Sequence, residues 1–133
     1  MTDYVSLLKE NDLKATFQRM NILDVIDRSG HMSVESIYDA VSKVHPSISL
    51  ATIYKNINIM LENAFIQEVK VPHTKAVFEL TKESHSHLIC DNCSSIEDIY
   101  LNLDTVLTSA TNASSFQANS ASIVICGLCK NCQ

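Results

Sequence analysis

Residues 49–71 read SLATIYKNINIMLENAFIQEVKV, and the period of the apolar side chains changes within this stretch. Up to residue 61 the apolar side chains recur three or four positions apart, as on one face of a helix. From residue 64 onward, and again in KAVFEL (75–80), the pattern favours strands, with PHT between them as a turn. The stretch therefore predicts a helix capped by Ser49 and followed by a hairpin. The positions expected to face inward on this helix are Leu50, Ile53, Tyr54, Ile57 and Leu61.

Three shorter helices are predicted upstream of this stretch. Small polar residues stand before each apolar run, as N-caps do, and glycine or a residue before proline stands after two of the runs. The expected caps are Thr2 or Asp3 for the first helix and Ser33 for the third, and the second helix is expected to start at Thr16. The expected stops are Ser29-Gly30 and His45-Pro46.

Short helices followed by a two-stranded hairpin are the order of a winged helix-turn-helix, whose recognition helix enters the major groove of DNA. The outward residues of the 49–61 helix are of types that contact bases or phosphates. They are Thr52, Lys55, Asn56 and Asn58, with Tyr54 at the margin. The alternative is a generic helical domain whose polar face is merely solvated.

Charge divides the chain near residue 82. Residues 1–82 hold nine of the ten Lys and Arg residues and ten of the fifteen acids, whereas residues 83–133 hold only Lys130 and five acids. The near-neutral first part argues mildly against DNA, although dimerisation would double a cluster of its cations. That cluster would contain Lys14, Arg19, Lys55, Lys70 and Lys75. We expect two domains, 1–82 and 83–133. Because neither a membrane span nor a secretory signal is evident, we expect a cytoplasmic protein.

All five cysteines follow residue 89 and form C-x-x-C spacings. In a reducing compartment such cysteines indicate metal ligands before disulfides. Pairing Cys90 and Cys93 with Cys129 and Cys132 gives the four thiolates typical of structural zinc. Cys126/Cys129 is the alternative second pair; we prefer 129/132 because Cys126 extends an apolar strand and can be a small buried hydrophobe.

Histidines precede the first cysteine pair in HSHLIC (85–90). In a strand His85 and His87 share one face, opposite Cys90. They are therefore expected to form a second site, with nitrogen and oxygen ligands, near the carboxylates Glu79, Glu97 and Asp98. The alternative is that both are exposed strand residues.

These motifs, taken together and in order, resemble those of the ferric uptake regulator family of metal-dependent repressors. The likeness rests on LKATFQRMNIL (13–23), SISLATIYKNINIM (47–60), AVFEL (76–80), HSHLICDNCSSIED (85–98) and CGLCKNC (126–132). It implies an α+β fold with an N-terminal winged helix-turn-helix and a small C-terminal α/β dimerisation domain with a structural zinc site. It also implies a homodimer on double-stranded operator DNA, and no enzyme activity.

The resemblance carries over particular residues. The structural zinc ligands match Cys90, Cys93, Cys129 and Cys132, and an Fe(II) or Mn(II) regulatory site matches His31, Glu79, His85, His87 and Asp98. Residues that match or favour DNA contacts are Lys14, Arg19, Thr52, Tyr54, Lys55 and Asn58.

Within the family the chain looks most like the peroxide-sensing repressors, in which Fe(II)-dependent oxidation of a ligand histidine, here His31 or His85, releases DNA. Asp98 fits that group, whereas Glu79 resembles the iron-uptake regulators. Phe17, in place of proline, and Lys55, in place of arginine, also depart from the family pattern. The alternatives are a regulator that responds to metal availability without sensing peroxide and, more remotely, a zinc-stapled thiol oxidoreductase using Cys126 and Cys129.

Overall fold

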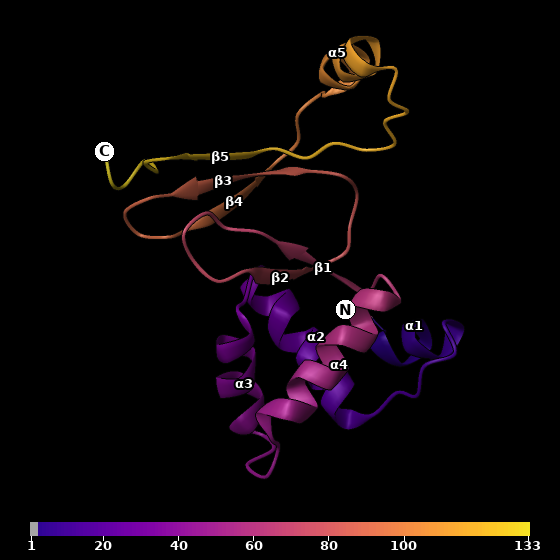
Figure 1. Ribbon diagram of the computed structural model, residues 1–133. Coiled ribbons are helices and arrows are strands. Elements are labelled where there is room, and N and C mark those ends of the chain that lie inside the picture. The colour runs from indigo at the N-terminus through magenta and orange to yellow at the C-terminus, as the bar shows by residue number, and fades with distance from the viewer. Residues whose placement is uncertain (1–2) are drawn as a thin grey trace. The chain divides into compact units, whose positions relative to one another are not determined.

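A computed structural model describes residues 3–133 of the chain (Figure 1). The chain separates into two compact units with the boundary between Thr81 and Lys82. The first unit holds four helices and a hairpin, and the second holds a three-stranded sheet and one helix. Among the described residues, no helix is long and apolar enough to cross a membrane.

The four helices of the first unit each begin where a polar side chain caps the backbone. They are α1 (Tyr4–Glu10), α2 (Phe17–Ser29), α3 (Val34–Ser42) and α4 (Leu50–Glu62). In each case the cap side chain accepts a hydrogen bond from the backbone N–H of the residue three positions later. This bond satisfies one of the N–H groups that have no partner within the first turn of a helix. The caps are Asp3, Thr16, Ser33 and Ser49. Asp3, Ser33 and Ser49 were predicted as caps, whereas Thr16, predicted as the start of its helix, is the cap just before it. The alternative first cap, Thr2, lies outside the described residues.

Helix α2 ends where predicted, whereas helix α3 ends earlier than predicted. Gly30 closes α2 with φ of 82°, a left-handed conformation that glycine adopts without steric cost. Helix α3 ends at Ser42, three residues before His45, so the prediction that His45-Pro46 ends it was too long. The N–H groups of Val44 and His45 both reach the carbonyl of Val41, which turns the chain before the proline is met.

The hydrophobic core of the described residues lies in the first unit. Fully buried side chains from all four helices meet there, including Leu8, Ile22, Leu23, Ile26, Ile37, Val41, Ile53, Ile57 and Met60. Leu50, predicted to face inward, is 42% exposed, so that prediction is wrong. Tyr54, predicted at the margin of the outward face, is 44% exposed. Asn56, predicted to face outward, is buried.

The hairpin consists of β1 (Ile66–Val69) and β2 (Val77–Leu80), paired antiparallel. Met32 forms an isolated bridge with Phe78, so the segment before α3 lies against β2. His73 sits in the turn with φ of 62°, at the tip of the hairpin as predicted. Helices followed by this hairpin give the winged helix-turn-helix that the change of period predicts.

The second unit contains β3 (Ser86–Cys90), β4 (Ile96–Ile99), α5 (Asp104–Ser114) and β5 (Val124–Gly127). Strand β3 lies in the centre of the sheet, antiparallel to β4 and parallel to β5 (Figure 1). All four residues of the edge strand β5 are exposed. Cys126 is therefore exposed, and the expectation of a buried thiol was wrong for the single chain.

Replacing Leu23 with alanine should destabilise the first unit by about 2–5 kcal/mol, because it removes a fully buried side chain and leaves a cavity. Leu50→Ala makes the same change at an exposed position and should cost well under half as much. Urea unfolding of both variants would measure this. Equal losses would contradict the assignment of Leu23 to the core.

Candidate metal centres and DNA-binding face

Four cysteine thiols converge in the second unit. Cys90 is the last residue of β3, Cys93 follows in a tight turn, and Cys129 and Cys132 lie just beyond β5. The parallel pairing of β3 with β5 aligns Cys90 with Gly127, which carries the chain end to the first cysteine pair. The four sulfur atoms lie within 4.8 Å of one another. Cys126 is not part of this group.

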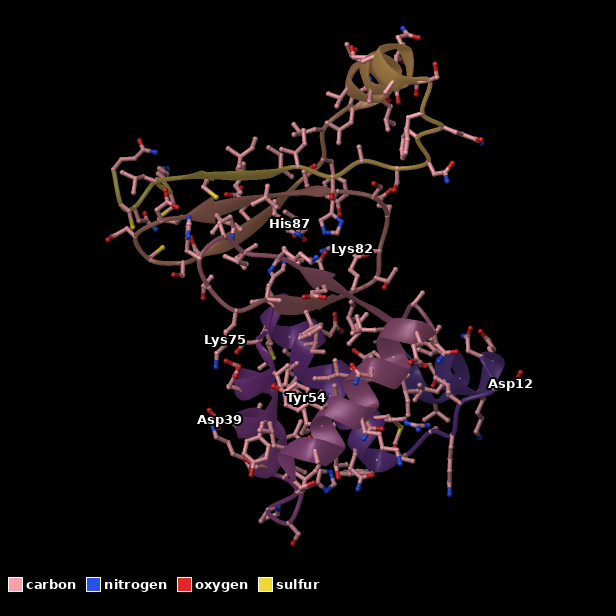
Figure 2. The ribbon with its side chains drawn as sticks, viewed as in Figure 1. Asp12, Asp39, Tyr54, Lys75, Lys82 and His87 are labelled. Atoms are coloured by element: carbon pink, nitrogen blue, oxygen red, sulfur yellow. The ribbon has the colours of Figure 1, made fainter. Side chains whose placement is uncertain are left out.

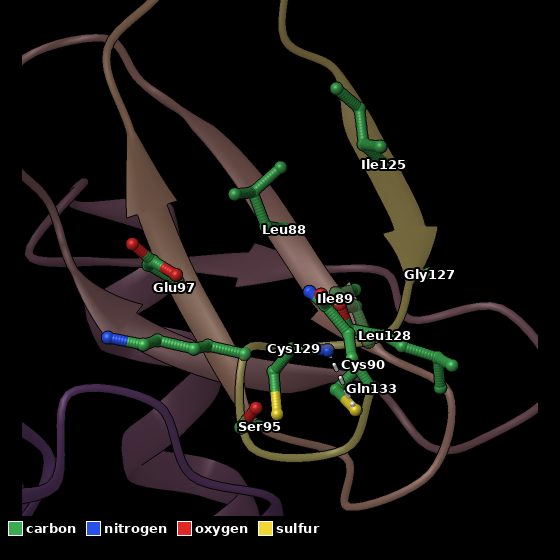
Figure 3. A pocket seen from close by; sticks show the side chains of 11 residues that line it. Leu88, Ile89, Cys90, Ser95, Glu97, Ile125, Gly127, Leu128, Cys129 and Gln133 are labelled. Carbon is green, nitrogen blue, oxygen red and sulfur yellow. Dashed lines mark hydrogen bonds between the residues drawn. The ribbon is translucent and has the colours of Figure 1, made fainter.

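The geometry of the cluster fits a tetrahedral zinc ion. Sulfur atoms about 2.3 Å from such an ion would lie roughly 3.8 Å apart. The Sγ atoms of Cys93 and Cys129 are 3.7 Å apart. The backbone N–H groups of Cys129 and Cys93 donate to Cys90 Sγ over 3.4 and 3.5 Å, one of which Figure 3 shows. These bonds lower the pKa of Cys90 to about 6, which favours the thiolate that binds metal. The Ser95 hydroxyl lowers the pKa of Cys93 in the same direction.

A cavity of about 300 Å³ lies beside this cluster. Figure 3 shows Leu88, Glu97 and Ile125 around it, with Cys129 close by. Glu97 pairs in register with Leu88, on the sheet face opposite Asp98. Of the two carboxylates that follow the first cysteine pair, Glu97 therefore belongs to the cavity and Asp98 to the histidine face.

Two histidines and an aspartate gather on that other face of the sheet. His87 on β3 pairs in register with Asp98 on β4, and its Nε2 lies 3.3 Å from Asp98 Oδ1. His85 lies one residue before β3, and its Nε2 is 3.6 Å from the same oxygen. The centroids of the His85 and His87 rings are 4.6 Å apart, and both side chains are buried. Lys82 forms an ion pair with the other oxygen, Asp98 Oδ2; Figure 2 labels Lys82 and His87.

The first unit carries a second histidine–carboxylate pair. His31 Nε2 lies 2.8 Å from Glu79 Oε2. The β-bridge between Met32 and Phe78 brings these two residues together, because His31 precedes Met32 and Glu79 follows Phe78. Gln67 Nε2 donates to the other oxygen, Glu79 Oε1, over 2.7 Å. Local reading of the sequence missed both His31 and Gln67. The contact of Gln67 could have been predicted from the register of the hairpin, in which Gln67 lies opposite Glu79.

Both sets of side chains offer imidazole nitrogen and carboxylate oxygen. Such donors suit Fe(II), Mn(II) and Zn(II), whereas the thiol cluster selects zinc or another soft ion. The donor chemistry thus distinguishes two kinds of candidate site.

The candidate DNA-contacting residues of α4 lie largely in solvent. Tyr54, Lys55 and Asn58 are exposed, and Figure 2 labels Tyr54. Thr52 is half-buried; its N–H is bound by the Ser49 cap, and its hydroxyl lies 3.0 Å from the Ser49 hydroxyl. Lys14 is exposed in the loop before α2.

Arg19 has an internal role that the sequence did not predict. Its Nε donates to Asn56 Oδ1 over 3.0 Å, and its Nη1 donates to the Lys14 carbonyl over 2.9 Å. Asn56 Nδ2 in turn donates to the Thr52 carbonyl. Arg19 therefore ties the loop that carries Lys14 to the buried side of α4, which accounts for the buried asparagine.

Phe17, the residue that replaces proline, does not disturb the start of α2. Thr16 still caps the helix, and the Phe17 ring packs edge-on against His45 with 4.7 Å between ring centroids. Phe17 itself remains 60% exposed.

The model of the ferric uptake regulator family matches residues 10–126 of the chain. The chain belongs to this family. The peroxide-responsive repressor PerR of Staphylococcus saprophyticus is 33% identical to it over 135 residues, covering 100% of this chain and 91% of that protein. The peroxide operon regulator of Bacillus subtilis is 29% identical over 134 residues, covering 99% and 92%.

Solved structures of the family agree with the fold. The ferric uptake regulator of Vibrio cholerae matches with a TM-score of 0.79 and 26% identity, over 96% of this chain and 100% of that one. The Campylobacter jejuni peroxide stress regulator matches with a TM-score of 0.76 and 31% identity, over 98% and 100%. The chain is thus a metal-responsive regulator of the ferric uptake regulator family, with peroxide regulators among its relatives.

Replacing Cys93 with serine should abolish zinc retention and strongly destabilise the second unit, because three thiolates bind zinc far less tightly than four. Cys126→Ser is the matched control, and we expect it to keep full zinc content. Metal analysis after dialysis, together with thermal unfolding, checks both variants. Equal zinc loss from both would contradict the four-cysteine assignment.

Proposed function

We propose that this protein is a dimeric, metal-dependent DNA-binding repressor that senses hydrogen peroxide through bound Fe(II). The observation that carries the proposal is that each unit presents imidazole and carboxylate donors. These are His31 with Glu79 in the first unit and His85 and His87 with Asp98 in the second. The peroxide-responsive relatives support the choice of signal.

One regulatory ion bound by donors from both units would couple them. The ligands would be His31, Glu79, His85, His87 and Asp98, and Fe(II) or Mn(II) fits this nitrogen and oxygen set. Cys90, Cys93, Cys129 and Cys132 would hold structural Zn(II) independently of that ion. Because the donors belong to both units, metal binding would fix the angle between the winged helix and the second unit.

That angle would control DNA binding in a dimer. Two α4 helices can enter successive major grooves only at one separation, about 34–36 Å for adjacent half-sites. A metal that favours this separation tightens DNA binding, and DNA tightens metal binding by the same factor. The first unit would supply the DNA contacts, through Lys14, Thr52, Tyr54, Lys55 and Asn58. Arg19 would hold the loop that contains Lys14.

The second copy would join through the second unit. Edge strand β5 exposes Val124 and Ile125, and Leu128 beyond it is 54% exposed. An edge strand with unpaired backbone groups and exposed apolar side chains is a ready template for pairing with another chain. We propose a homodimer that covers this edge.

Fe(II) would supply the chemistry that turns peroxide into a signal. In the net reaction the O–O bond of hydrogen peroxide breaks, one oxygen atom is added to a ring carbon of His31 or His85, and the other leaves as water. The histidine loses two electrons and peroxide gains them, so the balance needs no further reductant. An oxidised ring is a poorer ligand, and loss of the ligand releases the DNA.

A second candidate function rests on Glu79. Its carboxylate is one methylene longer than aspartate, the residue usual in the peroxide sensors that the chain resembles, and an iron-availability regulator would use it without oxidation. In that case metal level alone would set DNA binding. The thiol oxidoreductase alternative is disfavoured because Cys129 lies in the four-thiol cluster and Cys126 does not.

Anaerobic Fe(II) loading should give specific operator binding that low peroxide abolishes. We expect a mass gain of one oxygen on the peptide containing His31 or His85, measured by mass spectrometry alongside gel shifts. Mn(II)-loaded protein is the control and should keep both its mass and its DNA. Loss of binding with unmodified histidines would refute the peroxide mechanism, and metal-dependent binding that peroxide leaves intact would favour the second candidate.

Lys55→Ala should weaken specific DNA binding by about 1–3 kcal/mol, roughly 5- to 150-fold, because the side chain is exposed on α4. Lys130→Ala removes an equally exposed lysine from the second unit and should change affinity little. Fluorescence anisotropy at fixed salt measures both. If the Lys130 variant lost as much affinity as the Lys55 variant, α4 would not be the recognition helix.

A further inference from the structure

We propose that Gln67 is a positioning residue that makes Glu79 a ligand through one oxygen only. Gln67 and Glu79 are register partners on β1 and β2. The Gln67 amide donates to Oε1 over 2.7 Å, while His31 lies 2.8 Å from Oε2. The two oxygens thus have different partners: Oε1 accepts a hydrogen bond from the Gln67 amide, and Oε2 contacts His31 of the proposed metal site. The inference rests on the proposed metal site but adds a residue that the ligand pattern does not contain.

Burial makes the hydrogen bond from Gln67 important. The Glu79 side chain is 1% exposed, and a carboxylate taken out of water is costly unless its oxygens accept hydrogen bonds or bind cations. A hydrogen bond to a charged acceptor is about twice as strong as one between neutral groups. Rotating the carboxylate so that both oxygens face one ion would move Oε1 from the position in which it accepts this bond. We therefore expect Gln67 to oppose that rotation.

The hydrogen bond from Gln67 to Glu79 matters because it affects how many coordination positions of a bound ion remain open. Glutamate is long enough to bind an ion with both oxygens, as it does in many calcium sites. Each ligand residue that provides only one atom leaves more positions of a bound ion open to peroxide. A Glu79 that provided both oxygens would occupy one further position. By fixing Oε1, Gln67 would keep the site open despite the longer carboxylate.

Gln67→Leu removes the donor at similar volume and tests the proposal. In Mn(II)-loaded protein we expect a changed electron paramagnetic resonance spectrum, because the ligand field changes when Glu79 turns. In Fe(II)-loaded protein we expect peroxide-driven histidine oxidation to slow by about tenfold or more, the usual cost of losing a residue that orients a ligand. Glu68→Leu, an exposed position on the opposite face of β1, is the matched control and should change neither.

A cycle with Glu79→Gln shows whether Gln67 acts through Glu79. An amide at position 79 cannot bind through two carboxylate oxygens, so Gln67→Leu should add no further spectral change in that background. An equal further change there would overturn the proposal. So would a Gln67→Leu spectrum that superimposes on the wild type.

Zinc content and thermal unfolding show whether each variant is folded, and Gln67→Met carries the same test if Gln67→Leu does not fold. The Mn(II) spectrum needs no peroxide, so it separates this inference from the proposed function. If wild-type protein binds Mn(II) but ignores peroxide, the sensing function fails while the spectral test still decides the role of Gln67.

Discussion

The sulfur cluster at the end of β3 is the constraint on which the second unit depends. Within residues 82–133 the buried apolar side chains are only Ile89 and Cys90, whereas the hydrophobic core belongs to the helices and hairpin of the first unit. So small an apolar interior cannot offset the conformational entropy of ordering fifty residues. Structural zinc contributes about 10–16 kcal/mol of apparent binding free energy in small peptides, so a zinc ion bound by the four cysteines would add substantially to the stability of this unit. The cluster joins β3 to the chain end and so also fixes the parallel pairing with β5.

Strand β3 connects this rigid cluster to the candidate sensing residues. Side chains alternate along it, so His87 and Ile89 face one way and Leu88 and Cys90 the other. The first direction leads to Asp98, and the second leads to the thiols and the cavity beside them. With zinc bound by the four cysteines, one end of the strand would be held and could not easily slip in register, and a slip of one residue would exchange the two faces. The cysteine cluster thereby preserves the direction of the histidines.

Local signals predicted the local structure, and non-local pairings account for most of what they missed. Each helix cap is a short polar side chain before an apolar run, so the starts of α2, α3 and α4 were readable from a few residues. His31 and Gln67 act through contacts across the β2 strand, which no window of neighbouring residues contains. Asn56 was misplaced because an asparagine on a helix is normally solvated, and the donor to its buried Oδ1 comes from Arg19, 37 residues away. Leu50 is exposed because it is the first residue of α4, beyond the edge of the core.

Several cationic side chains of the first unit form hydrogen bonds or ion pairs within the protein. Arg19 is bonded to Asn56 and to the Lys14 carbonyl, Lys75 pairs with Glu35 over 2.5 Å, and Arg28 pairs with Asp24. A unit whose acids balance its bases has little long-range attraction for phosphate, so one copy should bind DNA weakly and with a shallow salt dependence. In the proposed dimer, tight binding would come from two copies held at the correct separation, where the second contact forms at high effective concentration. Such a dimer would gain specificity from the separation of its two recognition helices.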